Sequence, residues 1–155
     1  MGMSFSVAKP LKLPASLVNI FNNLKIYGHI KKIPEYGCLD KWNKQGVLLL
    51  NTALTTIMNK KLAHAKEWEF FTDAIIKKIS DECDYIVFLL WGSFAYKKIE
   101  LIDLEKHNCI ITSHPSPLSY NKKMNIFPAF KDSDIFGNTN KYLIKHNKKP
   151  INWKL

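Results

Sequence analysis

The chain has 155 residues, of which 46% are hydrophobic and 23% are charged. This length suits one compact domain, and this composition excludes disordered, collagen-like and coiled-coil chains. The apolar runs are far shorter than the ~20 residues that a membrane-spanning helix needs, and the first residues lack the apolar core of a signal peptide. We therefore expect residues 1–155 to form a single domain that neither spans a membrane nor is secreted.

The chain is strongly basic, with 23 Lys and Arg against 13 Asp and Glu and a formal charge of +10. Every basic residue is a lysine. The charge is +8 over residues 1–66, −5 over residues 67–105 and +7 over residues 106–155. A basic surface favours polyanions such as nucleic acid or an acidic membrane surface. We expect the two flanking thirds to face the polyanion and the middle third to form a solvated outer face.

The first half of the chain predicts one helix and one strand. Ser16, followed by apolar residues at helical spacing, is typical of a helix N-cap, so we predict a helix that runs toward Gly28. Residues 31–45 contain a proline and a glycine and are predicted to be an irregular connection. The run Val47–Leu50 is short, apolar and non-alternating, which is typical of a strand buried on both faces of a parallel sheet.

The second half predicts further alternation of helices and strands. Apolar side chains at helical spacing predict a helix over residues 67–80, and the apolar run 85–91 predicts a strand. Ser93 is placed to cap a short helix after that strand. Residues 109–112 form a third predicted strand, and the two prolines of residues 114–119 enforce an extended loop. The alternation predicts an α/β fold with a parallel sheet, which binds ligands at the carboxyl ends of its strands.

Polar residues follow the three predicted strands at these ends. The amide of Asn51 can read the edge of a nucleobase, although an asparagine also commonly terminates a strand. Ser93, after Gly92, can hold a phosphate at the start of a helix or can act as a plain cap. His114 can exchange a proton or stabilise an oxyanion, although a lone histidine in a proline-rich loop is more often structural.

Two apolar residues and three cysteines are the remaining candidates for functional residues. Leu118 lies at a loop tip, where it suits a wedge between bases or packs inward. Phe5 could stack on a base, although phenylalanine belongs to the core by default. Cys38, Cys83 and Cys109 lie far apart without metal-ligand spacing, so we expect reduced, buried thiols. The sequence predicts neither a metal nor a cofactor.

Six segments, in order along the chain, resemble motifs of the family 1 uracil-DNA glycosylases. They are Gly2–Val7 (GMSFSV), Gly46–Asn51 (GVLLLN), Trp68–Asp73 (WEFFTD), Phe88–Ser93 (FLLWGS), His114–Ser119 (HPSPLS) and Lys149–Trp153 (KPINW). The match extends from residue 2 to the C-terminal segment, so it covers nearly the whole chain. It implies a three-layer α/β/α fold with a central parallel sheet.

The resemblance also implies a role for each candidate residue. Phe5 would stack on a uracil flipped out of DNA, and Leu118 would fill the space that the nucleotide leaves. Asn51 would bond the polar edge of uracil and exclude cytosine, while His114 would stabilise the negative charge that develops on the uracil carbonyl; these two are the expected catalytic residues. Contacts to the DNA backbone would come from Ser16, Gly92, Ser93, Pro115, Ser116, Pro117 and Ser119.

The chain also departs from the family pattern. In the family, Gly-Gln-Asp-Pro-Tyr-His precedes the first matched segment; its aspartate directs the attacking water and its tyrosine excludes thymine. Residues 1–155 do not contain this run, so we expect a C-terminal portion that lacks the first strand of the sheet and has impaired activity on its own. Residues 121–127, Glu67 and Ala15 are smaller departures.

We therefore expect a uracil-DNA glycosylase that hydrolyses the N-glycosidic bond of uracil in single- and double-stranded DNA and so starts base excision repair. It is expected to be an intracellular monomer, located in the nucleus or the mitochondrion if its source is eukaryotic. One alternative is a catalytically inactive glycosylase-like module that binds DNA or another partner. The other is a basic α/β nucleotide-binding domain, which the lack of a Gly-rich phosphate loop disfavours.

Overall fold

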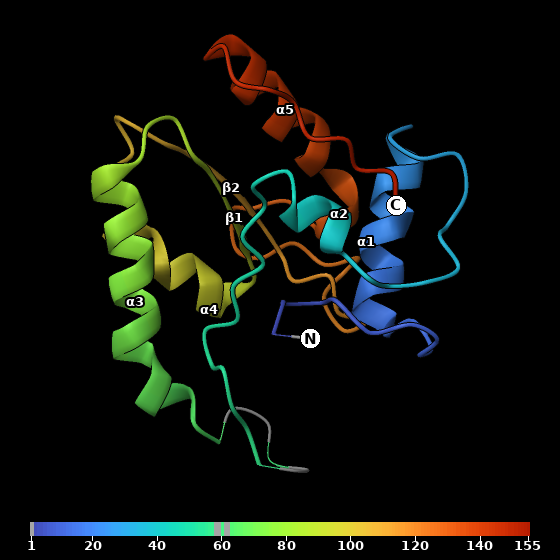
Figure 1. The fold of residues 1–155 in the computed structure, drawn as a ribbon, viewed down its shortest axis with the longest axis horizontal. Helices are drawn as coiled ribbons and strands as arrows, with labels where there is room; N and C mark the ends of the chain where they lie inside the picture. Colours follow the sequence, from blue (N-terminus) through green and yellow to red (C-terminus); the bar gives the residue numbers. More distant parts are fainter. Residues whose placement is uncertain (1, 58–59, 61–62) are drawn as a thin grey trace.

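The computed structural model describes residues 2–57, 60 and 63–155, and it shows a mixed α/β fold with helices on both sides of a small sheet (Figure 1). Its elements in chain order are α1 (Ala15–Ile26), α2 (Asp40–Asn43), α3 (Ala65–Glu82), β1 (Val87–Trp91), α4 (Ser93–Tyr96), the 3-10 helix η1 (Lys97–Leu101), β2 (Asn108–Thr112), the 3-10 helix η2 (Phe130–Asp132) and α5 (Ile135–Lys145). In this part of the chain, no helix is both long enough and apolar enough to cross a bilayer.

The sheet consists of β1 and β2, which run parallel as the sequence predicts. Their register pairs Val87 with Asn108 and Trp91 with Thr112. The N–H of Gly92 donates to the carbonyl of Thr112 at 2.9 Å, which continues the pairing beyond the last residue of β1. The two carboxyl ends therefore lie side by side, and the segments that follow them start from the same edge.

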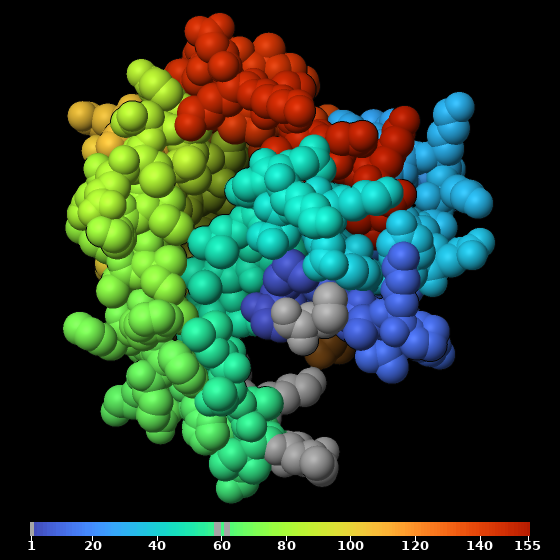
Figure 2. Space-filling model, viewed as in Figure 1, coloured from blue at the N-terminus to red at the C-terminus, as the bar shows by residue number. Residues whose placement is uncertain are grey.

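The prediction of a buried strand over Val47–Leu50 is wrong. This segment is extended, but within the described residues it has no ladder partner and makes one long-range backbone bond, from the N–H of Ser4 to the carbonyl of Leu49 at 2.9 Å. Leu48 is 58% exposed. Figure 2 shows the chain after α2 at the molecular surface, between α3 and the N-terminal residues. An apolar run becomes a buried strand only where neighbouring strands satisfy its backbone groups.

Two predicted helix caps are also wrong. Helix α1 begins at Ala15 with Pro14 as its N-cap, and α4 begins at Ser93 with Gly92 as its N-cap; neither has a side-chain cap hydrogen bond. Both serines lie inside the first turn. Gly92 has a φ of 90°, a conformation that glycine adopts without a steric penalty.

The core surrounds Trp42 of α2. Its ring lies 5.3 Å from that of Trp153, 6.1 Å from that of Phe136 on α5 and 6.3 Å from that of Phe21 on α1, centroid to centroid. Its Nε1–H donates to the carbonyl of Trp153 at 3.1 Å. Trp42 thus joins α1, α5 and the C-terminal segment.

Helix α3 has polar rather than apolar side chains at its fully buried positions. Its buried residues are Thr72 and Ser80. Lys98 of η1 lies 2.7 Å from a carboxylate oxygen of Glu69 and of Asp73. Burial lowers the pKa of Lys98, but the hydrogen bonds to the two carboxylates outweigh it, so the pKa is raised overall. This charged cluster ties α3 to the segment that begins at Gly92.

Candidate functional site

The loop over residues 113–119 follows β2 and carries several of the candidate residues. Ser113, which is buried, closes its base: its Oγ donates to the carbonyl of Ser119 and accepts the N–H of Phe130, each at 2.9 Å. Near the other end, Asn19 of α1 donates from Nδ2 to the carbonyl of Pro115 at 2.8 Å. Side chains from two directions thus hold the loop in one shape.

His114 presents a defined hydrogen-bond donor within this loop. The N–H of Ser116 donates to Nδ1 at 3.0 Å, so the proton of the neutral ring lies on Nε2. Burial lowers the pKa of His114, which keeps the ring neutral at pH 7. Within the described residues, Nε2 has no hydrogen-bond partner. It can therefore donate to a negative charge that forms next to it.

Gly92 allows His114 to approach the end of β1. A Cβ atom on Gly92 would lie 3.1 Å from the Cβ of His114, closer than side chains ordinarily pack. The positive φ of Gly92 adds a second reason for glycine at this position. Gly92 and His114 therefore lie against each other where β1 and β2 end.

Phe5 lies next to His114. Its ring centroid is 5.8 Å from that of His114 and 5.5 Å from that of Trp91. Its φ of 62° lies in the left-handed region, which is uncommon for a bulky residue. The N-terminal segment therefore turns sharply there and sets an aromatic ring beside the imidazole.

A pocket of about 430 Å³ opens between the two strand ends, and we call it the His114 pocket. Its lining residues are Trp91, Gly92, Ser93, Phe94, Ser113, His114, Ser116, Ser119, Lys122, Lys123 and Met124. Five predicted site residues are therefore brought together from two loops. The lining carries hydroxyl groups and two ammonium groups but no carboxylate, which suits an anionic ligand.

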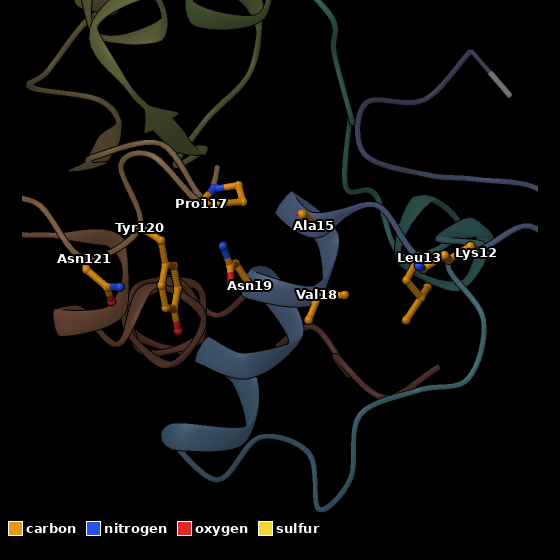
Figure 3. Close-up of a pocket in the computed structure, with 8 residues that line it drawn as sticks. All are labelled: Lys12, Leu13, Ala15, Val18, Asn19, Pro117, Tyr120 and Asn121. Atoms are coloured by element: carbon orange, nitrogen blue, oxygen red, sulfur yellow. The ribbon is translucent and has the colours of Figure 1, made fainter.

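A second pocket, of about 590 Å³, lies on the other side of the loop, against α1. Its lining residues are Lys12, Leu13, Ala15, Val18, Asn19, Pro117, Tyr120 and Asn121 (Figure 3). Leu118, the next residue after Pro117, is 81% exposed, so the alternative that it packs inward is wrong. Ser16 lines neither pocket, although it lies in the first turn of α1 beside this one.

Asn51, one of the two expected catalytic residues, does not line the pocket that contains His114. It ends the extended segment after Leu50, is half-buried and lines neither pocket. The Ser4 to Leu49 bond places its segment beside the residue before Phe5. Within the described part of the chain, the side chain of Asn51 makes no hydrogen bond.

The cysteines form no site. Cys38, Cys83 and Cys109 are free and half-buried rather than fully buried as expected. Burial raises the pKa of Cys109 to about 11, so its thiol is protonated at neutral pH. Over residues 2–57, 60 and 63–155, no three His, Cys, Asp or Glu side chains gather as a metal site would require.

Asn19 and Ser113, the two side chains that hold the His114 loop, are not among the residues predicted from the sequence. Asn19 lies 96 positions from its partner Pro115, so no local pattern marks the contact. A weak signal exists for each. Asn19 stands among the buried apolar residues of α1, and Ser113 is a hydroxyl residue directly after an apolar strand.

Comparison with known proteins assigns the family. The model of the uracil DNA glycosylase superfamily matches residues 1–144. The chain belongs to this superfamily. A uracil-DNA glycosylase of Idiomarina loihiensis is 48% identical over 98% of this chain, and a probable uracil-DNA glycosylase of Acanthamoeba polyphaga mimivirus is 41% identical over all of it.

Solved structures agree with this assignment. The crystal structure of the mimivirus uracil-DNA glycosylase matches this chain with a TM-score of 0.95 and 40% identity, and the match covers 100% of this chain. The superfamily fold expected from the sequence is therefore confirmed. The chain spans only part of its relatives: 68% of the Idiomarina protein, 45% of the mimivirus protein and 60% of the solved mimivirus chain.

Proposed function

We propose that this chain takes part in the hydrolysis of the N-glycosidic bond of uracil in DNA, as a uracil-DNA glycosylase active in DNA repair. The observation that carries the proposal is the Nε2–H of the neutral His114 ring, which has no hydrogen-bond partner among the described residues. The ring lies beside Phe5 and lines a pocket whose lining suits an anion. The names of the relatives support it. We also propose that the chain forms a single domain with a three-layer α/β/α arrangement around a central parallel sheet.

The geometry suggests how the bond would break. The electrons of the bond between the sugar carbon and the base nitrogen pass to uracil, and negative charge gathers on its carbonyl oxygen. The sugar carbon, which becomes oxocarbenium-like, then bonds the oxygen of a water molecule from solvent, and the proton of that water is released so that uracil leaves and a hydroxyl remains on the sugar. A hydrogen bond from Nε2 of His114 stabilises that charge more than it stabilises the bound substrate, which lowers the barrier. The ring of Phe5, beside His114, is placed to stack on the flipped base.

Recognition of the base and of the backbone follows from the same loops. Asn51 would hydrogen-bond the polar edge of uracil, after substrate brings its segment and the pocket together. Leu118, which is largely exposed to solvent, would occupy the position that the flipped nucleotide leaves. Backbone contacts would come from the residues Ser16, Gly92, Ser93, Pro115, Ser116, Pro117 and Ser119.

The alternative of a DNA-binding module without activity rests on one observation. The lining of the His114 pocket contains no carboxylate that could direct a water molecule toward the sugar carbon. We therefore propose that these 155 residues by themselves stabilise the leaving base but release uracil slowly. Salt-dependent DNA binding without any uracil release would favour the binding module.

The test is uracil release from a single-stranded oligonucleotide in single-turnover reactions with excess protein. We expect His114→Ala to slow release by about 10²–10³-fold, the usual loss for one such donor, while DNA affinity changes little. His146→Ala, a histidine at the C-cap of α5, is the control. Equal rates for His114→Ala and the unmodified chain would contradict the proposed role of His114.

A further inference from the structure

Asn23 is a fully buried amide on the apolar face of α1. The residue is 0% exposed, and the other buried residues of the helix are Leu17, Ile20, Phe21 and Leu24. Asparagine is a weak helix former, and burial of an amide is costly unless its polar atoms are hydrogen-bonded. The reason for an asparagine at this position therefore lies in what its amide contacts.

The amide of Asn23 fixes both ends of η2. Its Nδ2 donates to the carbonyl of Phe130 at 2.8 Å and to the carbonyl of Ser133, the C-cap of η2, at 3.0 Å. Both partners are acceptors, so the amino group must face them, and an ionised aspartate or an apolar residue could make neither bond. Asn23 thus determines where η2 lies against α1.

The other side of η2 holds the His114 loop. The N–H of Lys131, which shares a peptide group with the carbonyl of Phe130, donates to the carbonyl of Tyr120 at 3.3 Å. The N–H of Phe130 donates to Oγ of Ser113 at 2.9 Å. A displacement of η2 relative to α1 would therefore move both of these contacts with the loop.

A chain of hydrogen bonds continues from Ser113 to the imidazole. The Oγ–H of Ser113 donates to the carbonyl of Ser119 at 2.9 Å, and the N–H of Tyr120 in the same peptide group donates to the carbonyl of Ser116 at 2.8 Å. The N–H of Ser116 donates to Nδ1 of His114 at 3.0 Å. Hydrogen bonds in such a chain polarise one another. The bond that leaves the proton of the ring on Nε2 is therefore the last link of a network that starts on α1.

We propose that Asn23 is a positioning residue, which acts through η2 to fix the orientation and the tautomer of His114. Its role in uracil release rests on the proposed function, whereas its hold on the ring can be measured without substrate. Asn23 lines neither pocket and lies outside the six matched segments. It contributes preorganisation, because displacement of a catalytic group by about 1 Å can cost about 10²-fold in rate.

The first test is NMR of the isotope-labelled imidazole nitrogens of His114, assigned by their loss in His114→Ala. The variant is Asn23→Ala, and the matched control is Thr139→Ala: Thr139 is also buried, but its Oγ1 donates within α5, to the carbonyl of Ile135 at 2.8 Å. We expect the Nε2–H tautomer in the unmodified chain and in the control, and averaged Nδ1 and Nε2 resonances in Asn23→Ala. The same tautomer in all three proteins would overturn the inference.

The second test separates the chemical step from DNA binding in single-turnover uracil release, at a temperature where denaturant titration shows all three proteins to be folded. We expect Asn23→Ala to lower the maximal rate by about 10-fold, while the protein concentration that gives half the maximal rate changes by less than about two-fold. Thr139→Ala should change neither. A purely structural role would leave the rate per folded molecule unchanged, so equal maximal rates for the two variants would overturn the inference.

Tyr27→Phe keeps the inference testable if Asn23→Ala does not fold. Tyr27 is half-buried at the C-cap of α1, and its hydroxyl donates to the carbonyl of Lys131 in η2 at 3.3 Å. This variant should shift the His114 resonances in the same direction by a smaller amount, and unchanged resonances would overturn the inference. If the resonances shift but the unmodified chain releases no uracil, the proposed function fails and the positioning of His114 by Asn23 stands.

Discussion

Helices α1 and α3 both follow an amphipathic sequence pattern, but different forces hold them in the molecule. Of the 12 residues of α1, five are buried, and four of these are apolar. The 18 residues of α3 bury only Thr72 and Ser80, both polar. Phe70 and Phe71 on α3 are 87% and 50% exposed. Fully buried apolar side chains therefore anchor α1, whereas the fully buried side chains of α3 are polar and its apolar residues are at most half-buried.

This difference matters for the site, because each helix supports one of its loops. Helix α1 reaches the loop after β2 through Asn19 and Pro115. Helix α3 reaches the segment after β1 through Glu69, Asp73 and Lys98. Apolar packing is insensitive to pH, whereas charged contacts depend on it. A fall in pH should therefore weaken the contacts between α3 and the Ser93 segment, while the packing of α1 beside the His114 loop stays unchanged.

The largest expected effect comes from removing a tryptophan on the α1 side. Trp42→Ala should lower the free energy of unfolding by about 3–5 kcal/mol, because it leaves a cavity among three aromatic rings. The matched control is Trp68→Ala on α3, where the half-buried indole donates to the hydroxyl of Thr55 at 2.7 Å; about 1 kcal/mol is expected. Denaturant titration measures both, and equal losses would break the comparison.

A smaller effect is expected from the charged contacts of α3. Lys98→Met removes two charge-assisted hydrogen bonds and should cost about 2 kcal/mol of unfolding free energy. Lys78→Met, which removes an exposed pair with Glu82 on the same helix, should cost much less, because solvent screens the pair. If the two variants lose the same unfolding free energy, the cluster at Lys98 does not anchor the helix.

The smallest effect is a dependence on acid pH. The hydrogen bond from Lys98 lowers the pKa of Glu69, so its contribution is present above the ordinary pKa of about 4.5 and is lost as pH falls through the lowered value. The difference in melting temperature between the unmodified chain and Glu69→Gln should therefore shrink as pH falls below about 4.5. In the Lys98→Met background the difference should vary much less with pH, because only the weaker influence of Lys97 and Lys66 on the pKa of Glu69 remains. An undiminished variation would contradict the assignment to Lys98.

Local patterns explain why several elements could be predicted. The apolar spacing in residues 67–80 predicts a helix because one face repeats every 3.6 residues, and α3 contains that range. The prolines at 115 and 117 exclude a helix there by themselves. The rule that parallel strands present ligands at their carboxyl ends then places His114 near Gly92 and Ser93, which the shared pocket confirms.

Other features depended on partners that a local pattern does not show. Helix α5, with Asp134 as its N-cap, was not predicted, although a carboxylate before Ile135 and Phe136 is a usable signal. Val47–Leu50 has the composition of a buried strand, yet its exposure is set by which segments lie beside it. Burial is a property of the packed chain, because the same apolar side chain is covered or exposed according to its neighbours.

By itself, the sequence determined the superfamily, the alternation of helices and strands, and the residue types at the strand ends, because these depend on order and local spacing along the chain. Only the tertiary structure decided how those residues are held. Asn19 bonds Pro115, Ser113 bridges Ser119 and Phe130, and Lys98 binds two carboxylates of α3. These contacts join side chains that are separated in sequence, and their geometry follows from the packing of α1, α3 and the sheet rather than from any local preference.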